Sequence, residues 1–190
     1  EDSVVFLQSQ LMNDVNALAS GHWHYTGILN PQGRVLALFQ LAELDREHFF
    51  IILASLDPQW LVDYIKRFIF RSKVIINIEQ DYQVQGQFLD DKDTIDSALA
   101  ITGDFNAGFI LDIPDKSCTR KLLLSRTQVA TNLQAIDQWH CLDMAIGWLW
   151  IDEKLQNLWT PQMLSLQDIN AYSLKKGCYP GQEIVARTHY

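Results

Sequence analysis

The chain opens with apolar residues at helical spacing. Between residues 4 and 18 they recur every three or four positions, which predicts an amphipathic helix. The members of this stripe are Leu7, Leu11, Val15 and Leu18. Two apolar runs, 25–29 and 35–41, then flank Asn30-Pro31-Gln32-Gly33, where Pro at the second and Gly at the fourth position are typical of a type I turn. The pattern therefore predicts a helix followed by a β-hairpin.

Strand-like and helical patterns continue to alternate up to residue 88. Residues 48–54 read as a strand, and Asp57-Pro58 is an N-cap and first-turn pair that opens a helix reaching about Phe70. The β-branched run 73–78 predicts a further strand, as do residues 82–88. The β-α-β order over residues 48–78 indicates a small module of sheet and helix.

The second half of the chain carries weaker patterns. Strand-like and helical segments are predicted, in order, at 105–113, 121–125, 127–138 and 140–149. Residues 90–93 form an acidic loop, and Thr160-Pro161 is an N-cap pair that opens a segment toward Leu174. Helices and strands are intermixed throughout, so the fold class is mixed, α/β or α+β.

Composition narrows the class of protein. The 190 residues suffice for one large or two small domains, and 48% hydrophobic with 20% charged residues is ordinary for a folded protein. No apolar run approaches the roughly 18 residues of a membrane span, and the start Glu1-Asp2-Ser3 shows no signal peptide. The first residue is not Met, so we expect the start of a longer chain to be missing. A net charge of −8 argues against direct nucleic-acid binding.

The cysteine and histidine spacings disfavour a metal site. Cys118, Cys141 and Cys178 form no CxxC pair, so we expect a reducing, cytoplasmic environment and no stable metal in this chain alone. His22 and His24 alternate as they would on a strand, and we interpret them as surface residues.

Cys178 stands out among the cysteines. It lies between Gly177 and Gly181, with Lys175-Lys176 before it and Arg187 after it. Nearby cations and a helix N-terminus favour the reactive thiolate. Pro180 suits a first helical position, and a helix over residues 182–188 would point its positive end toward the thiol. The segment predicts an exposed, activated cysteine on a tight turn; the alternative is a buried, inert cysteine.

Residues 176–183, Lys-Gly-Cys-Tyr-Pro-Gly-Gln-Glu, resemble the signature of the YgfZ family of folate-binding proteins, which are relatives of the glycine-cleavage T-protein. The following Val185-Ala186-Arg187 agrees as well. Three further stretches match the family in order, namely 6–15, 29–34 and 68–74.

The resemblance implies an α+β architecture of lobes with small mixed sheets and flanking helices. Residues 1–45 and 139–190 would form a discontinuous first lobe that carries the cysteine motif, and 46–138 an inserted ferredoxin-like second lobe. A C-terminal β-barrel lobe would follow the motif and is absent from these 190 residues. The N-terminal strand of the first lobe is also expected to be missing.

The resemblance further implies a role in the assembly or repair of iron–sulfur enzymes, including radical-type enzymes that methylthiolate tRNA. Tetrahydrofolate or a derivative would be the cofactor. By its position in the motif, Cys178 would provide the thiol that carries this function. The remaining motif positions are Lys176, Gly177, Tyr179, Gly181, Gln182, Glu183 and Arg187. Tyr179, Gln182 and Glu183 could orient the thiol loop, although Gln and Glu in a first helical turn also have a simple capping explanation.

The resemblance implies that three residues contact folate. Trp139 falls where the family places an indole against the folate, with core packing as the alternative interpretation. Asp14 falls where the T-protein keeps a carboxylate beside the reactive folate nitrogens, and Asn13 belongs to the same segment. An exposed helix residue is the alternative for Asp14.

The sequence departs from the family at Ser9, Met12 and Ala145; the last stands where a relative often places an acid. The acidic pair that follows the hairpin in the T-protein is also lacking, which argues against aminomethyl transfer. Three functions stay open: a folate-dependent accessory protein for iron–sulfur enzymes, a folate-dependent one-carbon transferase, and a folate-sensing scaffold without chemistry. We favour the accessory protein over an enzyme.

Overall fold

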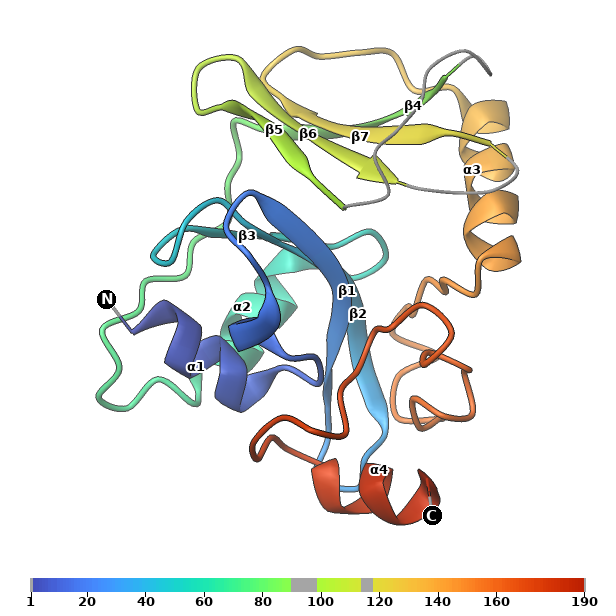
Figure 1. Cartoon of the computed structure of the whole chain (residues 1–190). Helices are drawn as coiled ribbons and strands as arrows, with labels where there is room; N and C mark the ends of the chain where they lie inside the picture. Colours follow the sequence, from blue (N-terminus) through green and yellow to red (C-terminus); the bar gives the residue numbers. More distant parts are fainter. Residues whose placement is uncertain (1, 90–98, 114–117, 190) are drawn as a thin grey trace.

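The computed structural model describes residues 2–89, 99–113 and 118–189. Two antiparallel sheets are stacked along the molecule, with helices at their flanks (Figure 1). This confirms the α+β class. The sheets are antiparallel throughout and not mixed, because each of their strands pairs with an antiparallel neighbour. The acidic loop predicted at 90–93 and the strand-ending Pro114 lie outside the described residues.

Helix α1 covers Ser3–Gln10 and is shorter than the predicted helix over 4–18. It stops because the following residues bond elsewhere: the Met12 N–H donates to the Gly27 carbonyl at 3.0 Å, beside the first sheet. A short 3-10 turn, η1, follows at Val15–Ala17. The apolar stripe still reaches the core, since Leu7, Leu11, Val15 and Leu18 are all buried in one cluster.

The predicted hairpin is confirmed. Strand β1 (His22–Leu29) pairs with β2 (Val35–Glu43), and β3 (Phe49–Ile52) pairs with the other edge of β2. The Asn30 side chain accepts hydrogen bonds from the N–H groups of Gln32 and Arg34, both at 2.9 Å, and so fixes the turn.

Helix α2 (Pro58–Lys66) begins as predicted, with the Asp57 carboxylate accepting from the Gln59 N–H. It ends four residues before the expected Phe70. Together α1 and α2 cover one face of the first sheet (Figure 1). Their shared core includes Phe6, Leu11, Phe39, Leu61 and Ile65.

The strand predicted at 73–78 is wrong. The segment is not part of either sheet, although its side chains alternate: Val74 and Ile76 pack on the α1–α2 core and Ile75 is 86% exposed. A β-branched run favours extended backbone, but a strand also needs a partner edge. The predicted β-α-β module is therefore not completed.

The second sheet contains β4 (Gln83–Phe88), β5 (Ile101–Asp104), β6 (Gly108–Ile113) and β7 (Arg120–Ser125) in the order β4-β7-β6-β5. Strand β5 was not predicted. The strand expected over 105–113 starts only at Gly108, because the Asp104 carboxylate accepts from the Asn106 and Ala107 N–H groups and closes a turn there.

One helix, α3 (Leu133–Ala145), replaces the two helical patterns predicted at 127–138 and 140–149. The Asn132 side chain caps it, and Gly147, with φ of 86°, follows its end. It lies beside the second sheet (Figure 1).

Residues 152–170 consist largely of successive turns. The helical segment expected from Thr160-Pro161 toward Leu174 is wrong, because Ser165 and Asn170 adopt positive φ angles of 53° and 52° that interrupt a right-handed helix. The C-terminal part supplies Trp148, Ile151 and Leu166 to the core on the opposite side of the first sheet from α1 and α2. Helix α4 (Gln182–His189) then confirms the predicted helix after the cysteine motif.

The boundary between the two sheets does not coincide with the boundary predicted between the two lobes. Strand β3 and α2 lie within the predicted second lobe, 46–138, yet they pack with the first sheet. The sheets therefore divide at Gln83 and not at residue 46; the assignment of lobes itself stays a prediction. None of the helices in the described ranges is long and apolar enough to cross a membrane.

Candidate functional site

The loop that carries Cys178 joins the C-terminal turns to α4. Cys178 is a free, exposed thiol, and a Cβ built on its neighbour Gly177 would meet nothing within 4 Å. The alternative of a buried cysteine is therefore excluded. Cys141, on α3, is a second free and exposed thiol, and Cys118 is half-buried.

Lys176 anchors this loop to the N-terminal segment. Its side chain is buried, and the Nζ ammonium donates to the carbonyl oxygens of Gln8 at 2.6 Å, Asn13 at 3.0 Å and Leu11. Carbonyls at the C-terminal end of a helix have no intrahelical donor and attract cations. Lys176, two positions before Cys178 in the sequence, thus caps α1, although 165 residues separate it from Leu11.

Burial and charge act on the Lys176 ammonium in opposite directions. Desolvation lowers the pKa of Lys176 to about 8, and the nearby Asp14 carboxylate raises it. The three carbonyl acceptors also favour the protonated form. Tyr179 closes the other side, with its ring centroid 4.9 Å from the ammonium nitrogen. At neutral pH, Lys176 is therefore a buried and fully engaged cation.

Asn13 and Asp14 hold the segment that receives Lys176. The Asn13 side chain donates to the carbonyls of Tyr25 at 2.9 Å and Asn170 at 2.7 Å, so it joins β1 to the C-terminal turns. Asp14 is half-buried and accepts from the Gln8 amide at 3.0 Å and from the Asn16 N–H at 3.1 Å. Asn13 and Asp14, two of the three residues predicted to touch folate, thus have structural partners here.

His24 belongs to the same cluster, and the sequence interpretation missed it. It was expected at the surface, but both faces of the first sheet are covered, so its Nε2 is buried without a hydrogen-bond partner in the described part of the chain. Burial, and then the Lys176 charge, lower the pKa of His24 to about 4, against the opposing Asp14 carboxylate. No sequence signal distinguishes this histidine from its strand neighbour His22.

The motif loop also docks on the hairpin turn between β1 and β2. Gly181 has a φ of 81°, and a Cβ added there would lie 2.5 Å from the Asn30 carbonyl oxygen and 2.7 Å from the Gly33 Cα. Gln182 donates through Nε2 to the Lys176 carbonyl at 3.1 Å. Two stretches that carry the family resemblance, 29–34 and 176–183, therefore meet in space, which is why the motif needs glycine at position 181.

The last two motif residues, Glu183 and Arg187, lie exposed on α4. Glu183 falls in the first turn of the helix, where a carboxylate interacts favourably with the helix dipole. The motif thus divides into a buried anchor and an exposed part that contains the thiol.

Trp139 lies in a different part of the molecule. Its indole packs on Gly86 and on Phe88, with a ring-centroid distance of 5.6 Å to the latter, and the Arg120 guanidinium lies 4.6 Å from its ring centroid. Figure 1 shows α3 beside the second sheet and α4 at the opposite end of the molecule. The structure therefore groups Asn13, Asp14 and Lys176 but does not bring Trp139 to them.

The indole of Trp139 is also 9% exposed and offers no open face for stacking. Beside it, Arg120 forms a buried ion pair with Asp143 at 2.8 Å, and Trp150 donates to the other carboxylate oxygen at 2.9 Å. Ala145 is exposed near the end of the same helix. Within the described ranges, no group of three or more His, Cys, Asp or Glu side chains is placed to hold a metal ion.

Comparison with known proteins identifies relatives of this chain. No protein-family model matches the chain. It is 33% identical over 192 residues to an uncharacterized protein of Haemophilus influenzae, and 30% identical over 204 residues to a tRNA-modifying protein YgfZ of Aliivibrio fischeri. A tRNA-modifying protein YgfZ of Colwellia psychrerythraea is 25% identical over 210 residues.

These similarities extend over the whole chain, which spans 62–63% of the length of the three relatives. They cover the cysteine motif, the hairpin turn and the N-terminal segment that the structure brings together. The chain therefore belongs to the YgfZ family.

Proposed function

We propose that this protein supports tRNA modification as an accessory factor for the assembly or repair of iron–sulfur enzymes in the cytoplasm, with Cys178 as its working thiol. One observation carries the proposal: the loop presents Cys178 to solvent while its neighbour Lys176 fixes the loop to the protein interior. Several relatives bear the name tRNA-modifying protein, which supports the same role.

An exposed thiol on an anchored loop suits chemistry with a partner protein. Thiolate sulfur is a good ligand for iron and for clusters, but a single cysteine cannot hold a cluster by itself. A client enzyme, such as a radical-type tRNA-modifying enzyme, would therefore supply the remaining ligands. With a net charge of −8, direct contact with the tRNA backbone is not part of the proposal.

The test is replacement of Cys178 by Ala in cells that depend on this protein. We expect the methylthio content of tRNA to fall toward the level of cells without the protein. Cys141→Ala is the matched control, because Cys141 is equally free and exposed but lies on α3. A normal methylthio content with Cys178→Ala, at equal protein abundance, would overturn the role of the thiol.

Tetrahydrofolate or a derivative is the cofactor we propose, on the family resemblance. Trp139 does not fit as a stacking platform in this structure, since Gly86, Phe88 and Arg120 cover its indole. No step is assigned to folate for that reason. Asn13 and Asp14 remain the proposed contacts, because they lie at the junction of the N-terminal segment, β1 and the Lys176 anchor.

Tryptophan fluorescence during titration with tetrahydrofolate tests this part separately. A contact of Trp139 with folate, as the family resemblance implies, predicts weaker quenching in Trp139→Phe than in Trp60→Phe, a variant on α2, whereas the covered indole in this structure predicts equal quenching in both. Equal quenching in both variants would remove Trp139 from the site, while absence of saturable quenching and of any calorimetric signal would remove folate. A glycine-cleavage-type turnover with tetrahydrofolate would instead favour the one-carbon transferase.

A further inference from the structure

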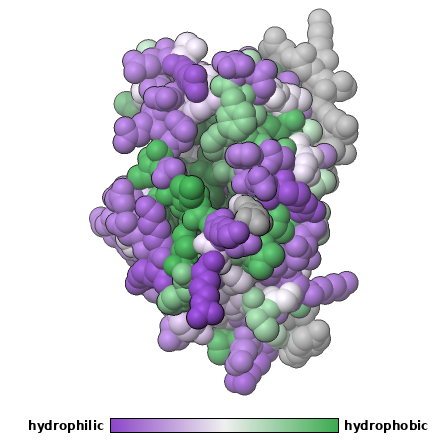
Figure 2. Space-filling view, turned by 90° about the vertical axis from the view of Figure 1, so that its left-hand side faces the viewer, coloured by the Kyte–Doolittle hydropathy of each residue, from purple (hydrophilic) through white to green (hydrophobic). Residues whose placement is uncertain are grey.

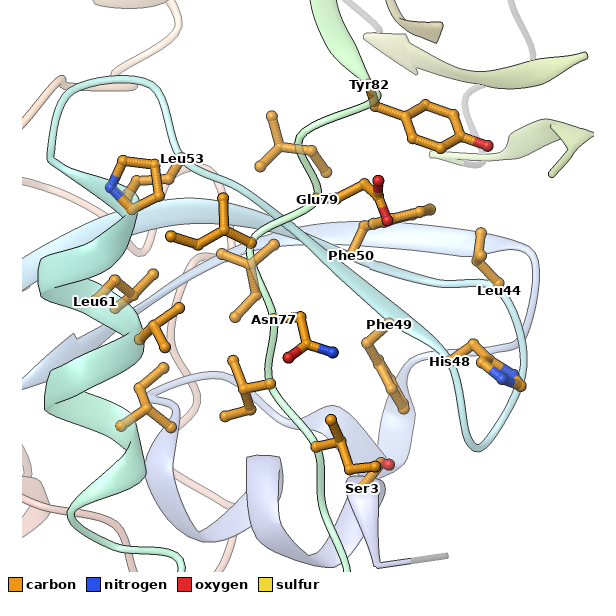
Figure 3. A pocket seen from close by; sticks show the side chains of 18 of the residues that line it. Ser3, Leu44, His48, Phe49, Phe50, Leu53, Leu61, Asn77, Glu79 and Tyr82 are labelled. Atoms are coloured by element: carbon orange, nitrogen blue, oxygen red, sulfur yellow. The ribbon is translucent and has the colours of Figure 1, made fainter. Parts of the chain in front are cut away.

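Helix α2 presents two sides with different surroundings. On one side, Leu61 projects toward a cavity of about 500 Å³ between β3 and residues 74–79 (Figure 3). Apolar residues gather around a hollow on the face of the molecule shown in Figure 2. The other side carries three aromatic rings and an arginine, none of which lines the cavity. We call this group the α2 ridge; it consists of Trp60, Tyr64, Arg67 and Phe68.

The side chains of the ridge pack on one another along the helix. Residues four apart lie on the same side of a helix, and the Trp60 and Tyr64 rings stack with centroids 5.5 Å apart. The Arg67 guanidinium lies 4.3 Å from the Tyr64 ring centroid, and its Nε donates to the Tyr64 carbonyl at 3.3 Å. Phe68 lies 5.4 Å from Tyr64 on the same side. These contacts hold Arg67 in place, so less side-chain entropy is lost when a partner binds it.

The polar groups of the ridge are hydrogen-bond donors. Within the described ranges, neither the Trp60 indole N–H nor the Tyr64 hydroxyl has a hydrogen-bond partner, and neither is a buried atom without one. Burial raises the pKa of Tyr64, against the Arg67 charge, so its hydroxyl keeps its proton at neutral pH. An indole N–H, a hydroxyl and a guanidinium beside one another suit an acceptor-rich ligand, and a carboxylate accepts several hydrogen bonds at once.

The local charge at the ridge is opposite to that of the whole chain. The net charge is −8, yet residues 66–73 contain four Lys and Arg residues, and no Asp or Glu occurs between Asp63 and Glu79. Arg67 and Arg71 are exposed, and in the described part of the chain neither forms an ion pair. A positive patch on a negatively charged protein selects and orients a partner with an acidic surface.

The arrangement of the rings favours a protein partner over a nucleic acid. Bases bind single-strand platforms by stacking on open aromatic faces, but Trp60 and the Arg67 guanidinium already lie against the Tyr64 ring. The net charge of −8 also opposes a polyanion. Trp, Tyr and Arg are, in contrast, the residue types that contribute most to binding energy at protein–protein interfaces.

We infer that the α2 ridge is a docking surface for an acidic segment of the iron–sulfur client enzyme, an inference that rests on the proposed function. Carboxylates of that segment would accept hydrogen bonds from the Arg67 guanidinium and the Trp60 indole, and Arg71 would add a second cation. Apolar side chains of the segment would cover the half-buried rings of Tyr64 and Phe68.

Titration calorimetry with a purified tRNA-methylthiolating iron–sulfur enzyme tests the inference. We expect Arg67→Glu to weaken binding at least about tenfold, and Arg71→Glu to act in the same direction, because each replaces an attractive charge by a repulsive one. Lys154→Glu is the matched control, since Lys154 is equally exposed but lies in the C-terminal turns. Equal affinity of Arg67→Glu and Lys154→Glu, or absence of binding by the parent protein, overturns the inference. Loss of binding to bulk tRNA alone overturns it in favour of a nucleic-acid surface.

The binding measurement separates the ridge from the thiol. Weaker binding of Arg67→Glu together with a normal methylthio content of tRNA in Cys178→Ala cells would support the ridge and reject the role of the thiol. Unchanged binding of Arg67→Glu together with a lowered methylthio content in Cys178→Ala cells would reject the ridge alone. The melting temperature of Arg67→Glu, which we expect to match that of Lys154→Glu because both residues are exposed, verifies that a loss of affinity is not a loss of folding.

Discussion

At the scale of single residues, the centre of this molecule is Lys176. Three carbonyl oxygens accept hydrogen bonds from its ammonium, the Tyr179 ring lies beside it, and the nearby Asp14 carboxylate favours the charged form. The energetic importance of such a group is that its removal leaves buried acceptors without a donor. Lys176 therefore links the stability of α1 to the position of the cysteine loop.

Replacing Lys176 by Met tests this link. We expect the free energy of unfolding to fall by about 2–4 kcal/mol, because three carbonyls lose a charged donor. Urea denaturation measures the change. Lys175→Met is the matched control, since Lys175 is exposed and its replacement is expected to change stability by less than about 0.5 kcal/mol. Similar losses in the two variants would contradict the anchor.

His24 makes the stability of the folded protein depend on pH. Its pKa is about 4 in the folded protein and 6.5 in the unfolded chain, so below pH 6.5 the unfolded state binds the extra proton first. Stability is therefore fully present above pH 6.5 and is lost as pH falls toward 4, by at most about 3 kcal/mol. Besides His24 itself, the charged groups acting there are Lys176 and Asp14.

Denaturant melts between pH 7 and 4 measure this loss. In His24→Gln the dependence is expected to be shallower, because glutamine does not titrate, whereas His22→Gln should keep the slope of the parent protein. If His24→Gln loses stability as steeply as the parent, another group is responsible.

At the scale of elements, the motif loop and the hairpin turn form one docking unit. Gly181 and Gly33 both have positive φ, 81° and 71°, and their backbones approach closely. The loop is thus held at two points, by Lys176 on α1 and by Gly181 on the hairpin. Between these points Cys178 remains exposed, which combines a fixed position with access for a partner.

Substitutions at two glycines of the cysteine loop test whether its contact with the hairpin turn stabilises the protein. Gly181→Ala places a Cβ 2.5 Å from the Asn30 carbonyl oxygen in a left-handed conformation, so we expect a loss of about 2 kcal/mol or more. At Gly177 an added Cβ meets nothing within 4 Å, so Gly177→Ala should be nearly neutral. Thermal unfolding compares the two; equal melting temperatures would show that the docking contact is dispensable.

At the scale of the whole molecule, α3 packs on the second sheet, which shares one hydrophobic core with the first sheet. The buried Arg120–Asp143 pair and the Trp139 indole join α3 to β4 and β7. Burial raises the pKa of Asp143, while its hydrogen bond from Trp150 and the charge and hydrogen bond of Arg120 lower it. Helix α3 lies at the other end of the molecule from α4, which follows the cysteine loop (Figure 1).

Asp143→Ala is expected to destabilise the protein by about 3–5 kcal/mol, because it leaves the Arg120 guanidinium buried without its carboxylate. Lys121→Ala breaks the partly exposed pair with Asp112 on the neighbouring strand and should cost less than about 1 kcal/mol. Chemical denaturation measures both. A small effect of Asp143→Ala would mean that α3 is held mainly by its apolar contacts.

Local patterns were sufficient for the hairpin, α2 and α4, because alternation, an Asp-Pro cap and a glycine turn act over a few residues. They failed for 73–78, where extended backbone lacks a partner edge, and for α1, which ends when Met12 bonds to Gly27. The missed strand β5 has a Gly and an Asp among its four residues, and its pairing with β6 outweighs that composition.

By itself, the sequence determined a mixed class of helices and strands, the hairpin, the cysteine loop and the family, since these depend on local spacing and on a motif of adjacent residues. Only the tertiary structure decided what the motif residues do. Lys176 caps a helix across the chain, the Nε2 atom of His24 is buried, and Trp139 packs on the second sheet. These outcomes depend on contacts between distant segments, and desolvation at such contacts has no local signature.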